Sequence, residues 1–234
     1  MDDQQVILKF ERELWNKGYK RIAGIDEAGR GPLAGPVVAA VVVFPPNVNP
    51  FLFKDSKKLK ESERENLFYE IVNSCLDFSV GFADSLEIDS LNIYKATLLA
   101  VHRALKGLKE KPDFLITDYL KVEGYEENSL VLVKGDERSF SCACASVLAK
   151  VTRDYIMKSF EEIFPGYDFS SNKGYPTKKH IAAIDKMGIT PIHRGSFGRV
   201  KGKRVRRGKD SFPLPVEERL RYYREKLQEL LGRD

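Results

Sequence analysis

Residues 24–36 read Gly-Ile-Asp-Glu-Ala-Gly-Arg-Gly-Pro-Leu-Ala-Gly-Pro, and this stretch says more about fold and chemistry than any other. Two adjacent acids, Asp26 and Glu27, follow an apolar segment with the composition of a buried strand. Neighbouring side chains of a strand point to opposite faces, so we expect the strand to end or break at these acids if both serve one site. A lone Asp-Glu pair is more often solvated in a hairpin turn, and these two residues alone leave that alternative open.

The turn that follows, with Arg30 between Gly29 and Gly31, is suited to close contact with a ligand. The two glycines carry no Cβ atom, so the backbone can approach a ligand closely. The planar guanidinium of Arg30 offers several donors to a phosphate or to a polar sugar edge. Acids for a metal ion, bare backbone and an arginine together indicate metal-dependent phosphate chemistry.

The composition is that of a globular protein with one good core and an appendage: 234 residues, 42% hydrophobic and 31% charged. No apolar run approaches the ~20 residues of a membrane span, and the acidic N-terminus is unlike a secretory signal. Three cysteines, an odd number, favour a reducing cytoplasm. We interpret Cys142 and Cys144, in a segment of small residues, as packing residues of a buried helix rather than zinc ligands.

Basic residues gather in two parts of the chain. The net charge of +5 and the pI of about 8.9 are weak evidence for an acidic partner. More telling is the segment from Arg199 to Lys209, which has seven basic residues and no acid. Contact with a phosphate backbone explains such a block, and so does a solvated linker. Lys54 to Lys60 form a second basic cluster.

The pattern of strands and helices predicts an α/β fold, with a mixed sheet flanked by helices. Ser62 and Glu65 are expected to form the capping box of a helix between the second and third strands. Strands are expected at residues 21–26, 36–44, 77–83, 114–118 and 130–133, and further helices at about 93–108, 139–164, 177–187 and 215–231.

Four acids follow predicted strands: Asp26, Glu27, Asp118 and Asp136. Ligand sites of open sheets gather beyond strand ends, so these side chains are expected to converge. Carboxylates that share one site repel one another unless cations neutralise them. An all-oxygen ligand set selects Mg²⁺ or Mn²⁺, and two such ions would stabilise both oxygens of an in-line phosphoryl displacement. Four unrelated surface acids are the alternative.

Several motifs occur in order along the chain: residues 25–36, Asp55-Ser56-Lys57-Lys58-Leu59, Lys134-Gly135-Asp136, residues 145–154, Lys173-Gly174-Tyr175, Pro191-Ile192-His193-Arg194 and Ser196-Phe197. In these motifs the sequence resembles the ribonuclease HII family, over roughly Arg21 to Phe197. That resemblance implies a ribonuclease H-like fold with a small helical C-terminal appendage. It also implies hydrolysis of the RNA strand of RNA–DNA hybrids, and nicking of duplex DNA on the 5′ side of a single embedded ribonucleotide. We therefore expect a catalytic domain over residues 1–198, then a basic linker and C-terminal helix over 199–234.

The resemblance also implies roles for individual residues. Asp26, Glu27 and Asp118 correspond to the metal-binding acids, and Asp136 to the fourth member of that site. The Gly29-Arg30-Gly31 turn corresponds to the element that senses the 2′-hydroxyl, the group that distinguishes RNA from DNA. Tyr175 corresponds to the tyrosine that packs on the deoxyribose after the ribonucleotide. Ser56, Lys57 and Lys58 are expected to hold phosphates, and Lys150 and Arg153 either do the same or face solvent.

Three positions carry further expectations. Asp154 lies four residues after Lys150, so an ion pair explains it more simply than catalysis does. His193 titrates near neutral pH and could shuttle protons, but a structural role is the simpler interpretation. Asp118 is followed by Tyr119 instead of a glycine-containing turn, so the loop after this acid is expected to differ in shape.

The preferred interpretation is a monomeric endoribonuclease that uses Mg²⁺ or Mn²⁺ and direct attack by water, leaving 5′-phosphate and 3′-hydroxyl ends. Its expected partners are RNA–DNA hybrids or duplex DNA that contains ribonucleotides, with no membrane. Another ribonuclease H-like nuclease acting on DNA alone is the enzymatic alternative. A non-catalytic binder of hybrid duplexes, in which the acids hold a structural cation, is the alternative from a different class.

Overall fold

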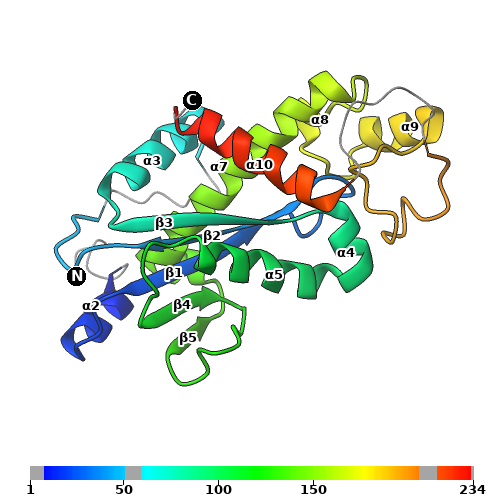
Figure 1. The fold of residues 1–234 in the computed structure, drawn as a ribbon. Helices are drawn as coiled ribbons and strands as arrows, with labels where there is room; N and C mark the ends of the chain where they lie inside the picture. Colours follow the sequence, from blue (N-terminus) through cyan, green and yellow to red (C-terminus); the bar gives the residue numbers. More distant parts are fainter. Residues whose placement is uncertain (1–7, 51–58, 206–214, 233–234) are drawn as a thin grey trace. The chain divides into compact units, whose positions relative to one another are not determined.

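The centre of the fold is a five-stranded sheet with the order β3-β2-β1-β4-β5, flanked by helices (Figure 1). The computed structural model describes residues 8–50, 59–205 and 215–232. Strands β1, β4 and β5 are parallel neighbours in a mixed sheet. The strands are β1 (Ile22–Ala28), β2 (Val37–Val43), β3 (Asp77–Ala83), β4 (Phe114–Asp118) and β5 (Ser129–Leu132).

Each predicted helix is present, but the helices at Lys9–Asn16, Ser85–Leu91, Gly135–Arg138 and Phe169–Asn172 were not predicted. The expected helix at residues 139–164 is a 24-residue helix that follows a short one, α6. The described helices are α2 (Lys9–Asn16), α3 (Glu61–Ser74), α4 (Ser85–Leu91), α5 (Ile93–Lys106), α6 (Gly135–Arg138), α7 (Phe140–Ile163), α8 (Phe169–Asn172), α9 (Lys178–Met187) and α10 (Val216–Leu230).

The chain divides into two compact units. Unit 1 comprises residues 1–28, 39–81 and 98–151, and unit 2 comprises residues 29–38, 82–97 and 152–234. The boundary between Ala28 and Gly29 separates the two predicted acids from the glycine turn.

The core of unit 1 forms where helices approach the sheet closely. The residues of β2 are all buried, as its run of valines and alanines predicts. At Gly24 in β1, a Cβ atom would lie 2.2 Å from the carbonyl carbon of Ser141, so only glycine lets α7 approach this strand. Cys142 and Cys144 are fully buried on α7, as the small-residue interpretation predicts.

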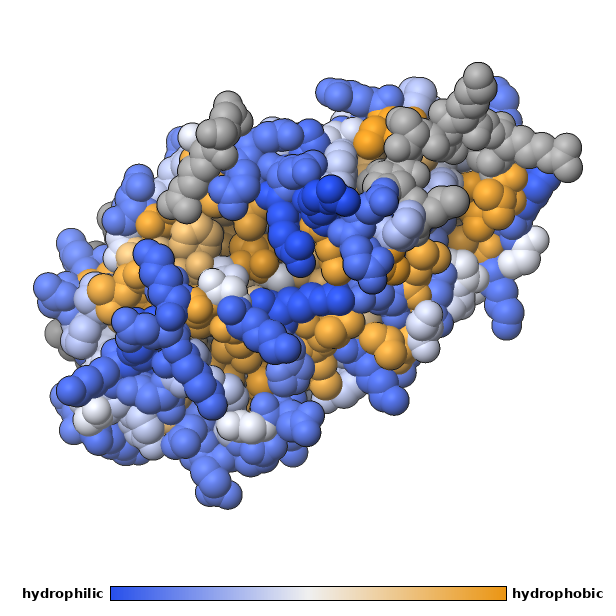
Figure 2. Space-filling model, viewed as in Figure 1, coloured by the Kyte–Doolittle hydropathy of each residue, from blue (hydrophilic) through white to orange (hydrophobic). Residues whose placement is uncertain are grey.

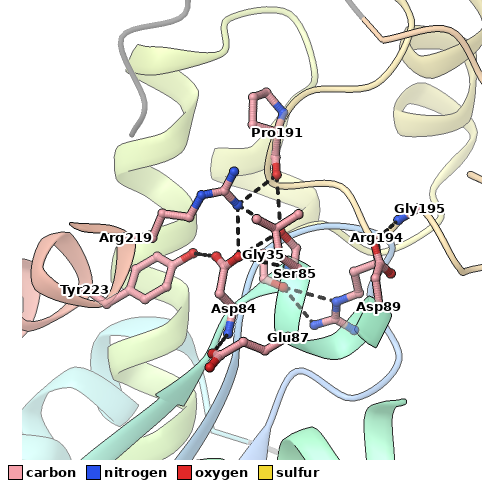
Figure 3. Close-up of polar contacts among 11 residues, drawn as sticks. Gly35, Asp84, Ser85, Glu87, Asp89, Pro191, Arg194, Gly195, Arg219 and Tyr223 are labelled. Atoms are coloured by element: carbon pink, nitrogen blue, oxygen red, sulfur yellow. Dashed lines mark hydrogen bonds and ion pairs between the residues drawn. The ribbon is translucent and has the colours of Figure 1, made fainter. Parts of the chain in front are cut away.

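In unit 2, α10 is held by a buried ionic cluster at the start of α4. Asp84 precedes α4 and accepts a hydrogen bond from the Leu86 amide. The same carboxylate forms an ion pair of 2.9 Å with Arg219 and accepts a 2.6 Å hydrogen bond from the Tyr223 hydroxyl (Figure 3). Helix α10 is thus an integral part of unit 2, because its anchoring side chains are almost completely buried.

Two predicted boundaries were wrong. Strand β1 does not end at Asp26 but continues through Glu27 to Ala28. Helix α3 does not use the Ser62 and Glu65 pair, since it begins two residues earlier than that cap would require. The Lys60 amide donates to the Glu63 carboxylate at 2.8 Å, and this bond serves an amide before the first turn of α3.

No helix in the described parts of the chain is long and apolar enough to cross a membrane. On the face drawn in Figure 2, hydrophilic and hydrophobic residues alternate in small areas.

Candidate active site

Asp26 and Glu27 lie near the end of β1, in unit 1. The Asp26 side chain is 7% exposed, and its Oδ1 accepts a 2.8 Å hydrogen bond from the Glu27 amide. Burial, followed by the negative charge of Glu27, raises the pKa of Asp26 well above its usual value. A hydrogen bond from Ser146 on α7 opposes this shift. Asp26 is therefore withdrawn from water and Glu27 is half-buried, whereas the simpler alternative expected both acids to be solvated in a turn.

Asp118 lies at the equivalent end of the neighbouring parallel strand. The β1–β4 register pairs Ile25 with Thr117, so the next residues along, Asp26 and Asp118, end up side by side. The charge of Asp118 also raises the pKa of Asp26, which places the two carboxylates within electrostatic reach. Parallel strands end at the same edge of a sheet, which is why the sequence predicts that these two acids lie near one another.

Asp136 is brought to Asp118 through its neighbour, Gly135. The Gly135 amide donates a 3.0 Å hydrogen bond to Asp118 Oδ1. A Cβ atom at position 135 would lie 3.1 Å from the Asp118 Cα, so a larger residue would push α6 away from the strand. Asp136 itself is 9% exposed. All four predicted acids therefore belong to one region of unit 1.

The chemistry of this donor set fits a divalent cation. Four carboxylates offer hard oxygen ligands. Burial, and then the charges of Glu27 and Asp118, raise the pKa of Asp26, and a cation would relieve the repulsion between these charges. The side chains as they stand are not gathered around one point. Within residues 8–50, 59–205 and 215–232, no three His, Cys, Asp or Glu side chains are close enough to hold a metal ion.

Tyr119, directly after Asp118, takes a backbone conformation that favours glycine. Its φ is 64°, and its side chain is 62% exposed. The Tyr119 amide donates to the Leu132 carbonyl at 2.9 Å, which holds the turn against β5. The loop therefore has the turn expected of a glycine-containing segment, although the sequence carries a tyrosine.

In unit 2, the glycine turn folds around a buried arginine, Arg194. Its guanidinium donates hydrogen bonds to the carbonyl oxygens of Gly29, Arg30, Pro32 and Gly35, at distances from 2.5 to 3.1 Å. Gly29 and Gly35 have φ values of 95° and 85°, in the left-handed region. No role was predicted for Arg194 itself, and its signal in the sequence was its place as a charged residue inside a family motif.

A second buried arginine, Arg153 on α7, corrects a prediction. It was expected to bind phosphate or face solvent, yet it is 1% exposed. It donates to the carbonyl oxygens of Ala34, Pro36 and Lys173, at 3.1, 3.0 and 2.9 Å. At Gly29, a Cβ atom would lie 2.1 Å from Arg153 Nε, so this arginine also explains that glycine.

Tyr175 lies beside the glycine turn. A Cβ atom placed on Gly31 would be 3.7 Å from the Tyr175 ring, which is 42% exposed. The Leu33 amide donates a 2.8 Å hydrogen bond to the Gly174 carbonyl, so the backbones of the two segments are joined. Unit 2 therefore brings together the turn and the aromatic residue that the resemblance assigns to sugar recognition.

His193 has the structural role that the simpler interpretation predicts. Its Nδ1 accepts from the Thr190 amide at 2.9 Å, so its Nε2 carries the proton and donates to His180 Nε2 at 3.1 Å. His180 Nδ1 then donates to the Tyr175 carbonyl at 2.9 Å. Burial lowers the pKa of His193 to about 3. A neutral histidine pair thus braces the Tyr175 segment.

Five further residues with predicted roles are Ser56, Lys57, Lys58, Lys150 and Asp154. Ser56, Lys57 and Lys58 lie outside the described residues. Asp154 is 7% exposed on α7, and Lys150 is half-buried one turn before it. Ser146, which bonds to Asp26, was not predicted to belong to the site, and its signal in the sequence was its place in the family motif at residues 145–154.

A sheet of this order, with acids at the ends of adjacent parallel strands, defines the class of ribonuclease H-like nucleases. The model of the ribonuclease HII family matches residues 23–200. The chain belongs to the ribonuclease HII family. It is a metal-dependent endoribonuclease that acts on RNA–DNA hybrids.

Relatives and solved structures agree. Ribonuclease HII of Aquifex aeolicus is 54% identical over 197 residues, covering 84% of this chain and 99% of the relative. Ribonuclease HII of Clostridioides difficile is 51% identical and covers 80% and 74%. The structure of ribonuclease H2 from Pyrococcus horikoshii superposes with a TM-score of 0.66 at 26% identity, covering 86% and 99%. A ribonuclease HIII determined in complex with Mn²⁺ shares the fold, with a TM-score of 0.57, 18% identity and coverage of 78% and 68%. These matches confirm the predicted fold class and family.

Proposed function

We propose that this enzyme nicks duplex DNA on the 5′ side of a single embedded ribonucleotide, in addition to hydrolysing RNA in hybrids. The products carry 5′-phosphate and 3′-hydroxyl ends, and the enzyme acts as a monomer. The observation that carries the proposal is the adjacency of Gly31 and Tyr175, with a free Cβ position 3.7 Å from the ring. An exposed glycine backbone can accept a 2′-hydroxyl, while an aromatic ring disfavours a polar group on the next sugar.

Asp26, Glu27, Asp118 and Asp136 are the residues proposed to hold Mg²⁺ or Mn²⁺, with two ions present when substrate is bound. Bound ions would neutralise charge on the attacking and leaving oxygens. The amide of Gly135 orients Asp118, and Ser146 orients Asp26, so these neighbours fix two of the carboxylates that would hold the ions. Ser56, Lys57 and Lys58 remain predicted phosphate contacts.

The test uses a labelled DNA duplex with one ribonucleotide, an all-DNA duplex and the Asp118→Asn variant. We expect one nick 5′ of the ribonucleotide with the wild type in Mg²⁺ or Mn²⁺, and none in all-DNA duplex or after chelation. Asp118→Asn should reduce the rate by at least about a hundredfold, because it removes a carboxylate from the proposed metal site.

Two outcomes would count against the proposal. Cleavage of long RNA–DNA hybrid without any nick at a single ribonucleotide would restrict the enzyme to hybrids. Nicking of the all-DNA duplex would show that the turn does not read ribose. Sedimentation of the free enzyme at the mass of one chain, 26.6 kDa, tests the monomer.

A further inference from the structure

Arg194 and Arg153 have no part in the proposed metal site, yet both are buried and donate hydrogen bonds to main-chain carbonyl oxygens. Arg194 is fully buried and Arg153 is 1% exposed. Of the described residues, the acid that acts electrostatically on Arg194 is Asp89, whose carboxylate itself accepts from the amides of Gly195 and Ser196. Burying a cation is costly unless it is fully hydrogen-bonded, so such an arrangement is expected only where it fixes a backbone.

The carbonyls that these arginines bind belong to two segments, and both segments are proposed to read sugars. Arg194 binds four carbonyls of the turn between Gly29 and Gly35. Arg153 binds Ala34 and Pro36 at the end of that turn and Lys173, two residues before Tyr175. Its guanidinium carbon also lies 6.0 Å from the centre of the Tyr175 ring. One side chain therefore connects the backbone of the turn to the segment that carries the tyrosine.

We propose that Arg153 and Arg194 are positioning residues that set the spacing between the glycine turn and Tyr175, and so determine selectivity for a ribonucleotide followed by a deoxyribonucleotide. The inference rests on the proposed function and deepens it. The turn would read the 2′-hydroxyl of one sugar and the tyrosine would read its absence on the next. To discriminate at such a junction, the turn and the tyrosine must be held at a fixed distance from one another. If either is misplaced, its contacts no longer stabilise the transition state of one substrate more than that of another.

Lysine is the appropriate replacement, because it keeps the charge but loses the planar set of donors. A lysine ammonium cannot reach three or four carbonyl oxygens spread around a guanidinium plane. Arg219 provides the matched control (Figure 3). It is also an arginine of unit 2, 1% exposed, and it bonds to Asp84, Ser85 and the Pro191 carbonyl, none of which belongs to the turn or to the Tyr175 segment.

The experiment compares Arg153→Lys, Arg194→Lys and Arg219→Lys with the wild type on two substrates. One is a duplex with a single ribonucleotide, and the other is a long RNA–DNA hybrid. The readout is the kcat/KM for the single-ribonucleotide duplex divided by the kcat/KM for the long hybrid. The melting temperature of each variant is measured as well. We expect the ratio to fall by about tenfold in the Arg153 and Arg194 variants. We expect the Arg219 variant to lose stability and keep the wild-type ratio.

An unchanged ratio in both turn variants would overturn the inference, as would an equal fall in all three. The wild type supplies a second readout in case a variant fails to fold. The amides of Leu33 and Gly35, which donate to Gly174 and Ile192, should exchange with solvent as slowly as core amides of α7 in the absence of substrate. Fast exchange would show that the turn is not held. A wild type that never nicks at a single ribonucleotide would instead contradict the proposed function. In that case, cleavage of the hybrid and amide exchange would still show whether the arginines hold the turn in place.

Discussion

At the scale of single residues, the sequence identifies the acids of the candidate site, but only the structure identifies the buried side chains that position the neighbouring backbone. Asp118 is recognisable because it closes an apolar strand, and Asp26 because it follows the apolar residues of another. Arg153 is not recognisable, because an arginine on a helix is normally interpreted as solvated or as a phosphate ligand. Only tertiary structure shows that its donors are directed at the carbonyls of Ala34, Pro36 and Lys173. Burial of a charge is therefore the part of this site that sequence patterns do not reveal.

Tyr119 offers a test of backbone strain beside a metal-site acid. With a φ of 64°, it occupies the left-handed region, where a Cβ atom costs about 1–2 kcal/mol. We expect Tyr119→Gly to be more stable than Tyr119→Ala by about 1 kcal/mol, because both lack the ring and only alanine keeps the strain. Urea unfolding of the two variants measures the difference. Equal midpoints would mean that the loop relaxes out of this conformation.

Glu11 on α2 is a buried acid that the sequence analysis did not single out. It is 2% exposed, and its Oε1 accepts from the hydroxyls of Ser139 and Ser141 at 2.6 Å and from the Ser141 amide at 3.0 Å. These donors lie at the start of α7, where a negative charge also interacts favourably with the helix dipole. We expect Glu11→Ala to lower the free energy of unfolding by about 2–4 kcal/mol, because buried donors are left without an acceptor.

The control for this change is Glu13→Ala, on the exposed side of the same helix. Exposed substitutions usually change stability by no more than about 0.5 kcal/mol. Chemical denaturation of both variants at one pH separates the two cases. Similar losses would show that α2 is destabilised by any alanine and that the Glu11 contacts contribute nothing specific.

At the scale of elements, the sequence predicted the strands and long helices because their apolar patterns are strong. The all-valine-and-alanine strand β2 and the small-residue helix α7 lie where expected. Besides the short helices that were not predicted, two boundaries differ from the prediction: the end of β1 and the start of α3. Strand β1, which lies between β2 and β4, continues past Asp26 to Ala28 although glycines follow. The start of α3 moves to Glu61, where Glu63 can serve the Lys60 amide.

The buried His193, which follows α9, is expected to make the stability of the protein depend on pH. Burial, followed by the charge of His180, lowers the pKa of His193 to about 3, against an ordinary value of 6.5. The unfolded chain therefore binds a proton below about pH 6.5 that the folded chain does not bind, so stability falls as the pH falls through this window. The expected contribution of this one group is about 1.4 kcal/mol per pH unit once the pH is well below 6.5.

This dependence is measured as the slope of the free energy of unfolding between about pH 6.5 and pH 5. His193→Asn should have a shallower slope than the wild type, since the titrating group is gone. His102→Gln is the control, because His102 is the one histidine outside the pair and should leave the slope unchanged. Identical slopes for the wild type and His193→Asn would mean that His193 titrates normally in the folded protein.

At the scale of the whole molecule, the basic block from Arg199 to Lys209 remains a predicted contact with the phosphate backbone. Residues 199–205 are described and residues 206–209 are not. Within the described part, Lys201 and Arg204 are exposed, whereas Lys203 forms an ion pair with Asp185 at 2.5 Å. Truncation after Arg199 would remove α10 and its buried contacts to Asp84, so point substitutions are the cleaner test.

Binding of an RNA–DNA hybrid to Lys201→Gln/Arg204→Gln, measured in Ca²⁺ over a series of salt concentrations, tests this contact. Each cation that contacts a phosphate contributes about 0.9 to the slope of log K against log salt, so the double variant should lose up to about 1.8. Lys203→Gln is the matched control and should change the slope less, because Asp185 already neutralises that lysine. A double variant with the wild-type slope would identify this part of the block as a solvated linker, and a loss as large in Lys203→Gln would show that the ion pair opens on binding.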